Sequence, residues 1–80
     1  MPRPLNLQKR SLSLNGHRTS VALEPAFWAV LEEAAAPAPL AALVATQDEM
    51  REAGEALASR LRLFALAYAR ARSGSDATGR

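Results

Sequence analysis

Residues 9–28 read KRSLSLNGHRTSVALEPAFW, and this stretch determines the fold. Asn15-Gly16 stands between two segments in which apolar and polar residues alternate. Asn-Gly is the strongest short-range hairpin signal, because both central residues of a type I′ turn need positive φ, which Gly adopts freely and Asn tolerates. The stretch therefore predicts an antiparallel hairpin of fixed register. The expected opposed pairs are Leu14 with His17, Leu12 with Thr19 and Arg10 with Val21.

The predicted register gives the hairpin one apolar face and one polar face, because successive side chains of a strand point to opposite sides. The apolar face carries Leu12, Leu14, Thr19, Val21 and Leu23, with His17 and Arg10 nearer its edges. The polar face carries Lys9, Ser11, Ser13, Arg18, Ser20 and Ala22. None of these six residues is acidic, and a small basic face suits a phosphate-lined groove. The alternative is an ordinary solvated sheet face.

Helical patterns fill the rest of the chain. Glu24-Pro25 favours a helix start, since Pro fits the first helical turn and a carboxylate favours the helix N-terminus. We expect helices over about residues 25–35, 40–52 and 55–72, with prolines at 37 and 39 ending the first and Gly54 as a weak break between the others. The expected inward residues are Phe27, Val30, Leu31 and Ala34 with Trp28 at the flank, then Leu40, Leu43, Val44 and Gln47, then Leu57, Leu61, Phe64, Ala65, Leu66 and Tyr68.

The chain of 80 residues has no cysteine and predicts one small α+β domain, mostly α, with an N-terminal hairpin and two to three helices. A domain of this size buries only about 60% of its unfolded surface. Because almost half of the residues are hydrophobic, we expect the chain to share its core with a second copy. We expect residues 1–8 to form a mobile arm, residues 9–72 the domain and residues 73–80 a disordered tail.

The net charge of +2 conceals a segregation along the chain. Residues 1–24 carry a net +3, residues 25–59 a net −5 and residues 60–80 a net +4. Such asymmetry is typical of a protein with one surface that meets a polyanion. The alternative is that the acidic middle and the basic ends attract each other within the fold.

Catalytic, metal and membrane signals are missing from the sequence. His17 is the single histidine, and no spacing supplies a metal site or a nucleophile with its base. The acidic residues between 48 and 55 lack the pattern of a calcium loop, and there is no glycine-rich phosphate loop. We therefore expect no enzymatic activity and no cofactor. Residues 1–8 lack the apolar run of a signal peptide and residues 34–47 are too short to span a bilayer, so we expect a cytoplasmic protein without a membrane partner.

Residues 9–70 resemble the ribbon-helix-helix domain proteins of bacteria. Two stretches carry the resemblance: HRTSVALEPAFW at 17–28 and LASRLRLFAL at 57–66. The first is the more specific, and it looks like the subfamily in which a short N-terminal strand precedes the usual one.

The resemblance implies a homodimer that binds double-stranded DNA, and a role as a transcriptional regulator. Strands from the two chains would pair antiparallel and enter the major groove. It implies that Arg18, Ser20 and Ala22 contact base edges, with Arg18 able to bond guanine, and that Ser59, Arg60 and Arg62 contact phosphates. Lys9, on the basic polar face of the hairpin, is a further predicted phosphate contact. Ser59 would either cap a helix that begins near Arg60 or lie inside a longer helix.

Two features depart from the simplest family pattern. A hairpin from each chain makes a four-stranded sheet, which is broader than a groove about 12 Å wide. Residues 9–14 must then splay away, cover an edge or replace the intermolecular pairing. The chain also has three predicted helices where the basic unit has two. The competing function is a protein interaction module, adaptor or antitoxin-like, that uses the hairpin and the basic third helix.

Overall fold

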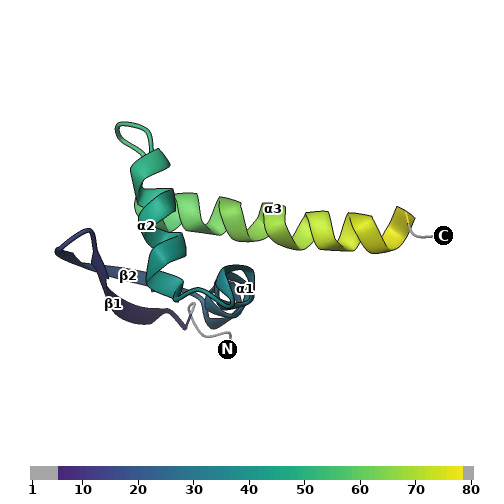
Figure 1. Cartoon of the computed structure of the whole chain (residues 1–80), viewed down its shortest axis with the longest axis horizontal. Helices are drawn as coiled ribbons and strands as arrows, with labels where there is room; N and C mark the ends of the chain where they lie inside the picture. The colour runs from purple at the N-terminus through teal and green to yellow at the C-terminus, as the bar shows by residue number, and fades with distance from the viewer. Residues whose placement is uncertain (1–5, 79–80) are drawn as a thin grey trace, which may run out of the picture.

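A computed structural model describes residues 6–78, with side chains through Ser73 (Figure 1). The elements in chain order are β1 (Gln8–Leu14), β2 (His17–Leu23), α1 (Pro25–Ala35), α2 (Leu40–Met50) and α3 (Leu57–Thr78). The predicted α+β class is confirmed, and α2 and α3 are separate helices. Helix α2 packs against β1 and α3 packs against β2, while the C-terminal end of α3 projects beyond the other elements (Figure 1).

The hairpin has the predicted turn and the predicted register. Asn15 and Gly16 have φ of 52° and 87°, as a type I′ turn requires. Leu14 pairs with His17, and the pairing continues without a bulge to Gln8 and Leu23. The predicted faces are also confirmed: the buried hairpin residues are Leu14, Val21 and Leu23, whereas five of the six polar-face residues are exposed and Ala22 is half-buried.

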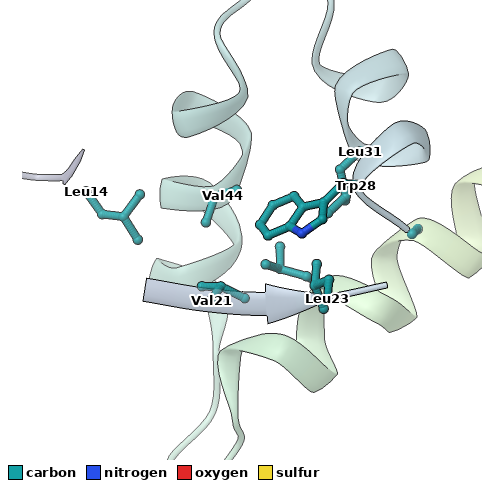
Figure 2. Packing of buried hydrophobic residues seen from close by; sticks show 8 residues of the cluster. Leu14, Val21, Leu23, Trp28, Leu31 and Val44 are labelled. Carbon is teal, nitrogen blue, oxygen red and sulfur yellow. The ribbon is translucent and has the colours of Figure 1, made fainter. Parts of the chain in front are cut away.

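Trp28 is the largest side chain of the core, and its predicted place at the flank of α1 is wrong. The indole is 1% exposed and lies among Leu23, Leu31 and Val44 (Figure 2). Its Nε1 donates a hydrogen bond of 2.7 Å to the backbone oxygen of Gln8. The Gln8 oxygen on β1 explains why Trp28 is buried and not at the flank, because a Trp can be fully buried once its N–H has an acceptor.

The helix boundaries follow the turn chemistry of the sequence. Helix α1 has the predicted bounds. Helix α2 ends at Met50, two residues before the predicted end, and Gly54 has a φ of 85° that a continuous helix cannot contain. Helix α3 continues to Thr78, six residues past the predicted end at 72, since serines and one glycine weaken a helix without ending it.

The apolar stripe of α3 is narrower than predicted. Leu61 and Ala65, four residues apart, are buried against the core. Leu66, predicted inward, is 51% exposed, because it lies about 100° around the helix from Ala65.

The division into an arm of residues 1–8, a domain of residues 9–72 and a tail of residues 73–80 stays a prediction, and residues 1–5 and 79–80 lie outside the described part. Within the described residues, no single helix is both long and apolar enough to cross a bilayer. Helices α1 and α2 meet these criteria only as a pair, and they are bent by 98°.

Replacement of Trp28 by Phe tests the contact between β1 and α1. Trp28→Phe removes the N–H group, so the Gln8 backbone oxygen loses its donor, and the smaller ring leaves a small void. The free energy of unfolding should therefore fall by about 1–3 kcal/mol. Urea denaturation followed by circular dichroism measures this change. Met50→Ala, at an exposed position of α2, should change it by less than about 0.5 kcal/mol. Equal stabilities of Trp28→Phe and the parent would contradict the role given to the indole.

Candidate nucleic-acid interface

The outward face of the hairpin is a continuous polar strip. It consists of three cross-strand pairs: Lys9 with Ala22, Ser11 with Ser20, and Ser13 with Arg18. The Ser11 and Ser20 hydroxyl oxygens lie 3.3 Å apart in the middle of the strip. Successive pairs on one face are about 7 Å apart along a strand. We call these six residues the ribbon strip; it faces away from the helices, which cover the opposite side of the hairpin (Figure 1).

The ribbon strip contains two cations that no carboxylate neutralises. Lys9 and Arg18 are exposed, and neither has an ion-pair or hydrogen-bond partner in the part of the chain that the structure describes. Arg70 on α3 shares this property. A polyanion at the strip would thus displace only water from these side chains.

In the described part of the chain, five other arginines form ion pairs. The pairs are Arg10 with Glu32 (2.5 Å), Arg51 with Asp48 (3.0 Å), Arg60 with Glu55 (3.4 Å), Arg62 with Glu24 (3.0 Å) and Arg72 with Glu33. The attraction between the acidic middle of the chain and its basic ends, one of the two readings of the charge pattern, is therefore present. These ion pairs neutralise most of the described arginines that lie outside the ribbon strip.

Ser59 does not begin a helix. Helix α3 starts at Leu57, and the N–H of Arg60 donates to the oxygen of Ala56 (3.0 Å), so Ser59 lies exposed within the first helical turn. Of the two predicted placements, the helix-interior one is confirmed. The helix starts before Arg60 because the loop of residues 51–56 is closed by its own hydrogen bonds, so the chain can become helical at Leu57.

The two arginines predicted beside Ser59 are engaged elsewhere. Arg60 donates from Nε to the Oε1 of Gln47 (3.1 Å), and this bond gives the amide oxygen of the buried Gln47 a donor. Arg62 donates from Nε and from Nη2 to the two carboxylate oxygens of Glu24, at 3.0 and 3.3 Å. Both arginines belong to α3, which packs against the apolar side of the hairpin, so the structure does not bring them together with the ribbon strip.

Residues 7–69 match the family model described as Ribbon-helix-helix domain. The chain belongs to the ribbon-helix-helix domain family. Members of this family typically bind DNA as dimers and are generally not enzymes. No curated protein and no solved structure matches the chain. Residues 6–73 gather no three His, Asp or Glu side chains that could hold a metal ion.

In this ribbon-helix-helix chain, the strand that leads into α1 has a free edge. Strand β2 pairs with β1 on one side, and no hydrogen bond joins its other edge to any described segment. An open edge presents a row of backbone donors and acceptors that another strand can satisfy. Sequence patterning located β2 and its pairing with β1, and the structure adds that no described segment covers the second edge.

The ion pair between Glu24 and Arg62 joins the end of β2 to α3. This pair was not predicted from the sequence, because the two residues are 38 positions apart. Hydrogen bonds from the Arg62 guanidinium lower the pKa of Glu24 below its usual value of 4.5. A lowered pKa in the folded state means that the ionised carboxylate stabilises the fold. This stabilisation is complete above the usual pKa and is lost as the pH falls through the lowered value.

Glu24→Gln should reduce the melting temperature at neutral pH, because it removes the charge that Arg62 binds. The deficit relative to the parent should shrink at acid pH, where the parent's Glu24 also becomes protonated. Thermal melts from neutral to strongly acid pH measure both effects. Glu52→Gln, whose side chain is exposed, is the matched control and should follow the parent. A deficit that does not change with pH would show that the pair contributes no charge-dependent stability.

Proposed function

We propose that this protein is a sequence-specific DNA-binding homodimer and a transcriptional regulator of the cytoplasm, which inserts paired β2 strands in the major groove. The main support is the ribbon strip, a helix-free face with two unpaired cations and no acidic residue. The major groove admits a two-stranded β-ribbon. Family membership supports the same function, since ribbon-helix-helix proteins typically bind DNA as dimers.

The open edge of β2 supports the homodimer. Two copies of β2 can pair antiparallel about a two-fold axis, which makes the contact self-complementary. The pairing would satisfy the exposed backbone groups of both edges and continue the small apolar face of each hairpin into a shared core. The resulting sheet has the strand order β1-β2-β2-β1, with the two β2 strands at the centre.

Base contacts are assigned to the outward side chains of β2. Arg18 can donate two hydrogen bonds to the O6 and N7 of guanine, which is the commonest specific contact in DNA recognition. The Ser20 hydroxyl can pair with several bases, and Ala22 can offer an apolar contact to a thymine methyl group. Arg18 therefore carries the sharpest sequence preference.

Phosphate contacts by Lys9, Ser59, Arg60 and Arg62 stay a prediction. Lys9 is exposed and has no competing carboxylate among the described residues. A phosphate at Arg60 or Arg62 would compete with the ion pairs that both residues make inside the fold. Phosphate binding by Lys9 is thus the stronger part of this assignment.

A protein partner is the second candidate function, and one observation favours it. Leu63 and Leu66 lie on adjacent turns of α3 and are 61% and 51% exposed. Apolar side chains grouped on an exposed face often mark a protein contact. Under this alternative the hairpin and the basic third helix would bind an adaptor partner or a toxin instead of DNA.

Arg18→Ala should reduce affinity for the preferred duplex by about 1–3 kcal/mol and relax the preference at one base pair of each half-site. Selection of duplexes from a random pool, followed by titration of the enriched site, measures both effects. Arg70→Ala removes the same unpaired charge from α3 and should leave the base preference intact. If no sequence is enriched by the parent, or if both variants lose the same affinity without any change in preference, Arg18 does not read bases.

A further inference from the structure

In the proposed function only Lys9 of strand β1 has a role, and the width of the four-stranded sheet suggests a role for the whole strand. We propose that β1 is a phosphate-binding strand, whose Lys9, Ser11 and Ser13 contact the DNA backbone along both rims of the major groove. This inference rests on the proposed function, since it requires a dimer that binds DNA through paired β2 strands. It adds two site residues, Ser11 and Ser13, and gives the extra strand a task distinct from base recognition.

The spacing of strands places β1 over the groove wall. Neighbouring strands of a sheet lie about 4.8 Å apart, so the two β2 axes would lie about 2.4 Å from the two-fold axis and the two β1 axes about 7.2 Å from it. A groove about 12 Å wide has its walls about 6 Å from the same midline. The β2 strands therefore fit between the walls, and the β1 strands lie above the rows of phosphates. The strands by which the four-stranded sheet exceeds the groove width, the two β1 strands, would therefore contact the DNA backbone.

Strand β1 cannot move aside to let β2 enter alone. Its seven residues all pair with β2. The Gln8 backbone oxygen accepts the Trp28 indole hydrogen bond, and the Arg10 guanidinium lies over the Trp28 ring at 4.8 Å while it binds Glu32. These contacts hold the N-terminal part of β1, at Gln8 and Arg10, against α1. The predicted option that β1 splays away would therefore require its pairing with β2 and its contacts with α1 to break.

The outward side chains of β1 are all hydrogen-bond donors. Lys9 supplies an exposed ammonium group, and Ser11 and Ser13 supply exposed hydroxyls. Lysine and serine side chains are common phosphate ligands, and such contacts position a protein without reading sequence. The hydroxyl contact of 3.3 Å between Ser11 and Ser20 joins this strand to the base-contacting strand. A phosphate held by Ser11 would thus also orient the Ser20 hydroxyl.

Affinities for two duplexes test the inference: the site selected by the parent, and a duplex of the same composition in shuffled order. The double variant Ser11→Ala/Ser13→Ala should weaken binding to both duplexes by the same factor, about fivefold or more, with the base preferences of the selected site unchanged. Lys9→Ala should also lower the slope of log Kd against log salt by about one unit per protomer. Ser73→Ala, an exposed serine on α3, is the matched control and should bind both duplexes as the parent does.

Two results would overturn the inference without overturning sequence-specific DNA binding, and the first of them would also replace the paired β2 strands of the proposed function. If the serine variant shifts the base preference, β1 reads bases, and the hairpin of a single chain is itself the ribbon. If the serine variant binds both duplexes as tightly as the parent does, β1 lies away from the DNA. A parent that enriches no duplex and binds none at moderate salt would instead overturn the proposed function, and the role of β1 with it. Circular dichroism of each variant confirms that the substituted hairpin is folded.

Discussion

The two positive φ angles at Asn15 and Gly16 are the constraint on which the rest of the structure depends. They close the hairpin with two residues and so set which side chains share a face. A slip of one residue would turn the apolar set toward solvent and the serines and cations toward the helices. Because the register is fixed, one face of the hairpin can join the core while the other stays free for a ligand. The core and the ribbon strip are two results of one turn.

The helices complete this division by pairing most of the other described arginines with carboxylates. Arg10, Arg62 and Arg72 bind carboxylates at Glu32, Glu24 and Glu33, which are spread along the first helix and its start. These pairs stabilise the packing of α1 against β1 and α3, and they neutralise basic side chains that a polyanion would otherwise attract. Among the described residues, two of the three cations without an ion-pair partner, Lys9 and Arg18, thus lie on the ribbon strip. Such an arrangement favours one orientation of the protein on DNA.

Local patterns in the sequence predicted the elements well, because they depend on neighbouring residues. The turn, both faces of the hairpin and the bounds of α1 followed from backbone preferences and from side-chain alternation. The contacts of Trp28 and Arg62 did not, since their partners Gln8 and Glu24 lie 20 and 38 residues away. The same limit affected the candidate site. The outward residues of β2 were identified from alternation alone, whereas the ion pairs that engage Arg60 and Arg62 depend on how α3 packs.

The central claim is that the ribbon strip is the surface that binds DNA. An amide chemical-shift titration of the isotope-labelled protein with its selected duplex tests this claim most directly. We expect the largest changes at the residues of the strip, Lys9, Ser11, Ser13, Arg18, Ser20 and Ala22, with small changes along the exposed face of α3 at Leu63 and Leu66. Changes concentrated on α3, with the hairpin amides unmoved, would contradict the account and show that the protein uses a different surface.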